Sequence, residues 1–135
     1  MTVRRVSTVA EALAALPGAV AEAAAAFVAD ARNVAYAAYD GAGEPVGYAR
    51  AVVLTRPDDV RPQVFLYDIG VREDARRQGH GGALVRALLA ECRERGASEM
   101  FVLTNRSNAA ATALYASTGA VSDAGDDEVS LVWSF

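Results

Sequence analysis

Two arginines and three glycines lie close together in the middle of the chain, immediately before a helical pattern. Residues 76–82 read Arg-Arg-Gln-Gly-His-Gly-Gly. Backbone N–H groups at the start of a helix have no intrahelical partner, and together with the helix dipole they bind anions. Glycines leave this backbone open to a phosphate, and Arg76 and Arg77 can add charge-assisted hydrogen bonds. The segment therefore predicts a cradle for a diphosphate.

Other phosphate-binding and metal-binding patterns do not fit the chain. It contains neither Gly-x-x-x-x-Gly-Lys-Ser/Thr nor Gly-x-Gly-x-x-Gly, so we expect neither a P-loop nor a dinucleotide-binding turn. With one histidine and one cysteine, a zinc site built by the protein is not expected, and no metal is predicted.

Asp68 is a candidate general base, because it interrupts an apolar stretch, residues 64–71, that reads as a buried strand. A carboxylate is costly to bury there unless it is paired or functional. In such a place it could bind an ammonium group directly or through water. The alternative is an aspartate at a bulge or strand end that accepts hydrogen bonds from backbone amides.

Composition indicates one folded domain spanning residues 1–135, with 53% hydrophobic and 22% charged residues. The net charge of −4 argues against nucleic acid as a partner and suits a cationic acceptor, although mild acidity also serves solubility. A single cysteine, Cys92, is expected in the core and is consistent with the cytoplasm. No signal peptide is expected, and the alanine-rich residues 19–31 are too short to span a membrane.

Hydrophobic periodicity, together with capping and turn residues, predicts the helices and strands that position these residues. Thr8 with Glu11 forms a capping box, Ser107 or Asn108 caps the last helix, and Ala110, Ala113, Leu114 and Ser117 are expected on its apolar face. The expected strands cover residues 3–6, 33–39, 46–55, 64–71, 98–104, 120–123 and 128–135. The expected helices end at Leu16, about Ala31, Arg95 and Gly119, and the third opens on the glycines, with an apolar stripe from Ala83 onward.

Two motifs in this order resemble the GNAT superfamily of N-acetyltransferases. The first is Arg76-x-x-Gly79-x-Gly81 after a strand, which resembles the superfamily's acetyl-CoA pyrophosphate motif. The second runs from Asn108 to Gly119 and includes Ala111 and Tyr115 in matching places. Tyr67-Asp-Ile-Gly-Val71 before Arg-Arg-Gln-Gly further resembles the aminoglycoside (gentamicin) 3-N-acetyltransferases. The resemblance implies an α/β (α+β) GNAT fold, a mixed, mostly antiparallel sheet of about seven strands with four helices.

The resemblance also implies roles for individual residues. Tyr115 matches the general acid that protonates the leaving thiolate, and Asn108 matches a residue that binds the pantetheine arm of the cofactor. The backbone at the end of the central strand pairs with that arm and supplies an oxyanion donor, which here means Ile69, Gly70 and Val71. His80 stands where the family usually has an aliphatic residue, and we interpret it as packing. The cradle comprises Arg76, Arg77, Gln78, Gly79, His80, Gly81, Gly82 and Ala83.

The sequence therefore predicts an acetyl-CoA-dependent N-acetyltransferase that transfers the acetyl group directly to a small amine, with an aminoglycoside as the leading acceptor. One alternative within the class is another amine or a peptide N-terminus. The alternative outside the class is a non-catalytic acyl-CoA-binding module. A homodimer through the apolar last strand, residues 132–135, is also possible, since those residues could equally close the core.

Overall fold

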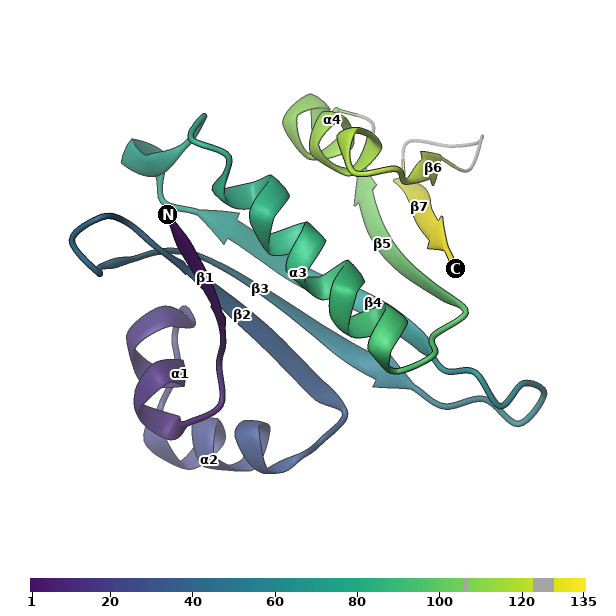
Figure 1. The fold of residues 1–135 in the computed structure, drawn as a ribbon, viewed down its shortest axis with the longest axis horizontal. Coiled ribbons are helices and arrows are strands. Elements are labelled where there is room, and N and C mark those ends of the chain that lie inside the picture. The colour runs from purple at the N-terminus through teal and green to yellow at the C-terminus, as the bar shows by residue number, and fades with distance from the viewer. Residues whose placement is uncertain (106, 123–127) are drawn as a thin grey trace.

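Seven strands form one mixed sheet in the order β1-β2-β3-β4-β5-β7-β6 in the computed structural model of the chain, which describes residues 1–105, 107–122 and 128–135 (Figure 1). The strands are β1 (Thr2–Arg5), β2 (Asn33–Tyr39), β3 (Pro45–Leu54), β4 (Gln63–Val71), β5 (Glu99–Asn105), β6 (Val121–Ser122) and β7 (Glu128–Ser134). The helices are α1 (Val9–Ala15), α2 (Ala21–Ala29), α3 (His80–Glu94) and α4 (Ala109–Ser117), with a short 3-10 helix, η1, at Glu73–Ala75.

This architecture confirms the predicted fold class and order of elements, with bounds shifted by a residue or two at most ends. The capping box of Thr8 and Glu11 is present, and the Asn108 side chain accepts a hydrogen bond from the N–H of Ala111. The η1 turn was not predicted. The predicted apolar face of α4 is confirmed at Leu114, which packs on the core, and is wrong at Ala110 and Ala113, which are exposed, whereas Tyr115 is buried. Alanine is small enough to lie on either face, so it gave no reliable periodicity.

The pairing of β4 with β5 is short and determines the shape of the site. β1 to β4 form an antiparallel meander, and β5 pairs antiparallel with β7 along its whole length. Between them, β4 and β5 run parallel and pair only from Gln63 and Glu99 to Phe65 and Phe101. Beyond these residues the two strands separate, so each leaves one backbone edge without a partner strand.

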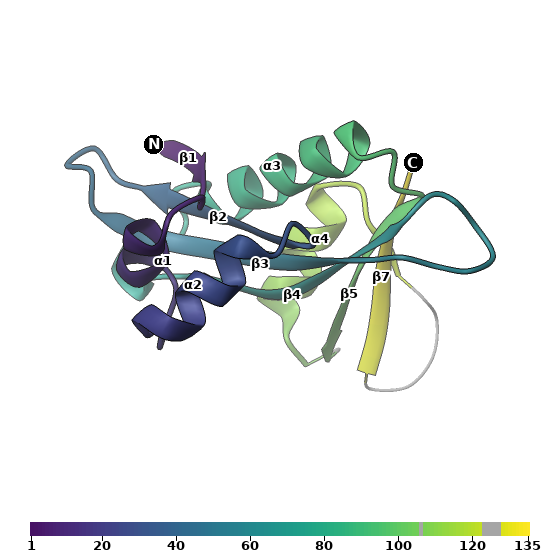
Figure 2. The ribbon, with the colours of Figure 1, turned by 90° about the horizontal axis from the view of Figure 1, so that it is seen from below.

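The helices cover both faces of the sheet, as Figure 2 shows, with α3 on one side and α1 and α2 on the other. Under α3 lies the larger core, which includes the buried Leu66, Leu84, Leu88, Met100 and Trp133. Cys92 belongs to this core, as predicted, and burial raises its pKa to about 12. Trp133 of β7 closes one side of this core. That β7 mediates a homodimer stays a prediction.

Small side chains form the interface between the sheet and the other two helices. Ala12 of α1 and Ala24 of α2 are buried against Ala35 and Ala37 of β2. Alanine on both surfaces lets the helices approach the sheet closely, as their composition predicts. None of the helices in the described part of the chain has both the length and the apolar character that crossing a membrane requires.

Candidate active site

A cleft of about 780 Å³ lies where β4 and β5 separate. Its walls come from the second half of β4, the end of β5, the loop and first turn of α3, and the inner side of α4. Most predicted site residues line it, including Asp68 and Tyr115, the Ile69–Val71 backbone and Asn108. The cleft thus brings together residues separated by nearly 50 positions in the sequence.

A β-bulge at Tyr67 redirects the half of β4 that lines the cleft. Arg50 of β3 pairs with Asp68, and the next residue, Ala51, pairs with Leu66, so Tyr67 has no partner on β3. The bulge keeps Ile69 and Val71 against the α3 core and turns Asp68 toward the opposite face. Tyr67 is left 61% exposed. One extra residue therefore decides which face of the sheet receives the carboxylate.

Gly70 follows the bulge and lies beneath the ring of Tyr48. A Cβ at this position would stand 2.8 Å from Cε1 of Tyr48, closer than real side chains approach. A side chain at this position would therefore displace the Tyr48 ring.

We expect Gly70→Ala to lower the free energy of unfolding by about 1–3 kcal/mol, the usual penalty for forcing extra volume into a packed contact. Removing the opposing ring should relieve most of this penalty, so the double variant Gly70→Ala/Tyr48→Ala should be more stable than the sum of the single effects predicts. Chemical denaturation of the four proteins measures this coupling. Additive effects would show that the ring is not what excludes a side chain at residue 70.

The backbone around the start of α3 has the character of an anion site. Gly79 caps the helix at φ +84°, a conformation that favours glycine. From Arg77 to Gly82, six consecutive amide N–H groups have no hydrogen-bond partner among the described residues. The first turn of α3 contains no acidic residue. These features fit a diphosphate, which would accept hydrogen bonds from the free amides.

Ala83 differs from the other residues of the predicted cradle, and its place in that cradle stays a prediction. Its N–H donates to the Gly79 carbonyl at 3.1 Å, and Ala83 does not line the cleft. The reason is that α3 begins at His80, three residues before the apolar stripe, so Ala83 closes the first helical hydrogen bond. Gln78 keeps a free N–H but also lies outside the cleft lining.

The neighbouring side chains shape the cradle in different ways. Arg76 donates from Nε to the Val71 carbonyl at 3.2 Å, which ties the loop to the end of β4. Arg77 adopts a positive φ of 64°, uncommon for a residue with a side chain. At Gly81 a Cβ would stand 3.2 Å from Leu114 of α4, so this glycine also lets the two helices approach.

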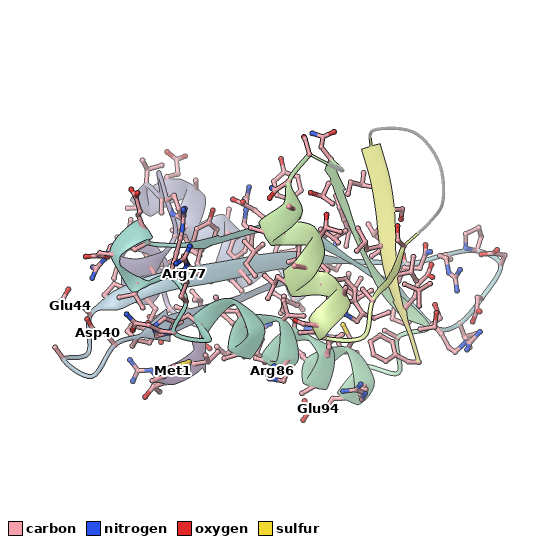
Figure 3. The ribbon with its side chains drawn as sticks, turned by 90° about the horizontal axis from the view of Figure 1, so that it is seen from above. Met1, Asp40, Glu44, Arg77, Arg86 and Glu94 are labelled. Carbon is pink, nitrogen blue, oxygen red and sulfur yellow. The ribbon has the colours of Figure 1, made fainter. Side chains whose placement is uncertain are left out.

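Arg86 is a cation near the cradle that sequence analysis missed. Its guanidinium nitrogens lie 3.2 Å from where a Cβ of Gly82 would stand, so the side chain reaches back along α3 toward its N-terminus. Figure 3 labels Arg77 in the loop before α3 and Arg86 on α3 itself. Neither makes an ion pair with another described residue. Arg86 follows Gly82 by four residues, about one helical turn, and no acidic residue lies between them. This spacing was the feature of the sequence from which its position near the cradle could have been predicted.

Asp68 lies between two cavities, and it is the one described residue that lines both. The first cavity is the cleft between β4 and β5. The second, of about 230 Å³, lies on the other face of the sheet beneath α1 and α2. The Tyr48 hydroxyl donates to Oδ2 of Asp68 at 2.9 Å, and Nε of Arg50 stands 3.8 Å from the same oxygen. Burial and this hydrogen bond raise the pKa of Tyr48 to about 12, so it remains a donor to the carboxylate.

Tyr115 reaches the cleft from α4. Its ring is 4% exposed and meets the Trp133 ring edge-on, with centroids 5.7 Å apart. Its hydroxyl has no hydrogen-bond partner among the described residues. Burial raises the pKa of this hydroxyl, and the Asp68 carboxylate raises it further. The group therefore stays protonated at neutral pH with a hydrogen available to donate.

Two other residues of the cleft have a structural role as well. Asn108 caps α4 through its side-chain carbonyl oxygen, and its amide nitrogen has no partner among the described residues. His80 is buried, as the packing interpretation requires, yet neither ring nitrogen has a partner among the described residues. Both line the cleft.

Several acidic residues lie away from this centre. Glu73 and Asp74 are exposed in η1, and Asp74 pairs with Arg72. Asp126 and Asp127 lie outside the described residues. Among the residues that the structure describes, no group of three or more histidine, cysteine, aspartate or glutamate side chains is placed to hold a metal ion.

Comparison with known proteins gives consistent matches. A protein-family model described as "Acetyltransferase (GNAT) family" matches residues 10–120. The [ribosomal protein bS18]-alanine N-acetyltransferase of Escherichia coli K12 is 42% identical over 60 residues, or 44% of this chain. The matched segment spans 40% of that relative's length.

Two solved structures share the fold across nearly all of the chain. An aminoglycoside acetyltransferase from an uncultured soil metagenomic sample, in complex with sisomicin, superimposes with a TM-score of 0.82 at 18% identity, covering 93% of this chain and 91% of that one. A ribosomal-protein-alanine N-acetyltransferase from Brucella melitensis superimposes with a TM-score of 0.78 at 20% identity, covering 100% of both chains.

Proposed function

Because this chain belongs to the acetyltransferase (GNAT) family, we propose that it transfers an acetyl group from acetyl-CoA directly to a primary amine. GNAT acetyltransferases use acetyl-CoA as cosubstrate, and the free amides at residues 77–82 suit its diphosphate. One observation supports the proposal above the others: Asp68 lines both the cleft beside these amides and the cavity under α1 and α2. A thioester and an amine entering from opposite faces would meet there.

Each step of acetyl transfer has a candidate group in this chain. Arg76, Arg77 and the cradle amides hold the diphosphate, with Arg86 adding positive charge. Asn108 donates to the pantetheine arm, and the unpaired edge of Ile69–Val71 supplies an N–H to the thioester carbonyl. Asp68 accepts a proton from the ammonium, directly or through water, so that a neutral amine attacks. Tyr115 donates its proton to the departing thiolate.

The proposals for the acceptor amine come from the proteins to which this chain is similar. The sisomicin complex of one structural neighbour favours an aminoglycoside amino group, with the 3-amino group as the specific proposal from the motif at residues 67–79. The ribosomal-protein enzymes favour an N-terminal alanine. A thiol-release assay with sisomicin, an alanine-initiated peptide and simple amines tests transfer itself. Tight binding of acetyl-CoA with no amine-dependent thiol release would favour the non-catalytic module.

We expect Asp68→Asn to lower kcat/KM for the amine about 30-fold while leaving the Kd of coenzyme A unchanged. The amide keeps the size of the side chain but can neither accept the proton nor attract the ammonium. The expected loss is smaller than the usual ~10²–10⁴-fold contribution of a general base, because the side chain is 41% exposed and water can substitute in part. Steady-state kinetics and calorimetry measure the two quantities.

Asp58→Asn is the matched control, because Asp58 is an exposed aspartate in the loop between β3 and β4, away from both cavities. It should match the unmodified protein in both measurements. Full activity of the Asp68→Asn protein would remove Asp68 from the mechanism.

A further inference from the structure

The cavity beneath α1 and α2 is small, and most of the described residues that line it have small or apolar side chains. Its volume of about 230 Å³ falls below the range of about 300 to 1,000 Å³ typical of pockets for drug-sized ligands. Alanines line much of it, and Leu16, Val20 and Phe27 supply its larger side chains. Arg50 and Asp68 are the charged side chains among the described residues that line it. It therefore suits a compact molecule with an apolar body and few charges.

Arg50 and Asp68 are neighbours on adjacent strands, and their charges lie side by side on one wall. They are register partners between β3 and β4, and Nε of Arg50 lies 3.8 Å from Oδ2 of Asp68. This separation is too long for a direct hydrogen bond. Each side chain remains about 40% exposed, at 39% for Arg50 and 41% for Asp68. A cation and an anion are thus both available to a ligand.

Aromatic side chains hold the two charges in position. The guanidinium carbon of Arg50 lies 4.4 Å from the centre of the Tyr67 ring, and the Tyr48 hydroxyl donates to Asp68. The side chain of Arg50 makes no hydrogen bond to another described residue, so its planar set of donors is free for a carboxylate. The bulge that exposes Tyr67 therefore also places a support under Arg50.

From this arrangement we infer that the acceptor is an α-amino acid, or a close analogue, with a small apolar side chain. The inference rests on the proposed acetyl transfer. The ammonium of such a ligand binds Asp68 next to the cleft, its carboxylate binds the guanidinium of Arg50, and its side chain occupies the apolar end of the cavity. In the transfer the amine nitrogen bonds to the acetyl carbon and the carbon–sulfur bond breaks. The ammonium loses two protons: the first passes to Asp68 or water before attack, and the second leaves the nitrogen as the amide forms and replaces the proton that Tyr115 gives to the departing thiolate.

The same wall is unfavourable for an aminoglycoside. Such a molecule has several ammonium groups and no carboxylate, and the described lining provides a single carboxylate with a cation beside it. An aminoglycoside ammonium bound to Asp68 would stand near the Arg50 guanidinium and be repelled by it, whereas the carboxylate of an amino acid would offset this repulsion.

Calorimetric titration of the protein saturated with coenzyme A tests the inference without any turnover. The probes are L-leucine and L-leucinamide at pH ~6.5, where both amines are mainly protonated. We expect L-leucine to bind at least about tenfold more tightly, because only it offers a carboxylate to Arg50. Arg50→Gln should reduce the preference to below about threefold. Arg32→Gln, on an exposed arginine paired with Asp30, should leave the preference unchanged.

Equal binding of the two probes, no binding of L-leucine, or tighter binding of sisomicin than of L-leucine would each overturn the inference. So would an unchanged preference in Arg50→Gln. Failure of the proposed function gives a different result. Selective binding of L-leucine with no release of thiol from acetyl-CoA would contradict acetyl transfer and support the cavity's preference for an amino acid.

Discussion

Gly79→Val should weaken the binding of coenzyme A about 100-fold, equivalent to about 2.7 kcal/mol. Residue 79 has a φ of +84°, where a β-branched side chain is strained by about 1–3 kcal/mol. The Cβ itself would meet only Cε of Met1, at an ordinary 3.6 Å, so the expected effect comes from the backbone. Relieving the strain moves the loop, and the amides from Arg77 to Gly82 then no longer converge. Titration calorimetry with coenzyme A gives the Kd.

Gly96→Val provides a control with the same strain at the opposite end of α3. Gly96 has a φ of +67°, with no atom within 4 Å of a Cβ built there. Both variants should lose similar thermal stability, and the Kd of coenzyme A should change in Gly79→Val alone. An unchanged Kd in Gly79→Val, together with a loss of stability that matches the control, would show that the start of α3 does not hold the diphosphate.

Sequence patterns were informative wherever the cause is local. The Thr8 capping box, the Asn108 cap and the glycine-rich start of α3 depend on side chains within a few residues, so they can be read without tertiary structure. The order of strands followed in the same way from short apolar segments and turns. The predicted opening of α3 on the glycines is confirmed, since Gly79 is its N-cap and the helix begins at His80.

The parts that sequence patterns missed depend on register between distant segments. The pairing of β4 with β5 stops after Phe65, and the bulge at Tyr67 exists only because Arg50 pairs with Asp68 while Ala51 pairs with Leu66. No local pattern records such a shift. The position of Arg50 beside Asp68 and the cavity under α1 and α2 follow from it. Asp68 could be predicted as a candidate base from its apolar neighbours in the sequence. Arg50 could not be predicted as the cation beside it, because it lies on a different strand.

Tyr115→Phe should lower kcat by at least about 100-fold, a typical contribution of a general acid, with no change in the Kd of coenzyme A. Phenylalanine keeps the edge-on contact with Trp133, so the packing of α4 is retained. Tyr36→Phe is the matched control, because that hydroxyl is half-buried and donates to Glu91 outside the cleft. It should retain normal kcat. Steady-state rates over a range of amine concentrations separate kcat from KM.

The pKa of Tyr115 determines how this loss depends on pH. Burial, followed by the Asp68 carboxylate, raises its pKa above the ordinary value of about 10. The hydroxyl is therefore fully protonated between pH ~6 and ~9, and the ratio of kcat between the unmodified protein and the Tyr115→Phe variant should be constant over that range. An acetyl thioester of an acidic aryl thiol needs little protonation on leaving, so it should restore most of the lost rate. A ratio that varies between those pH values, or no restoration by the aryl thioester, would contradict proton donation by Tyr115.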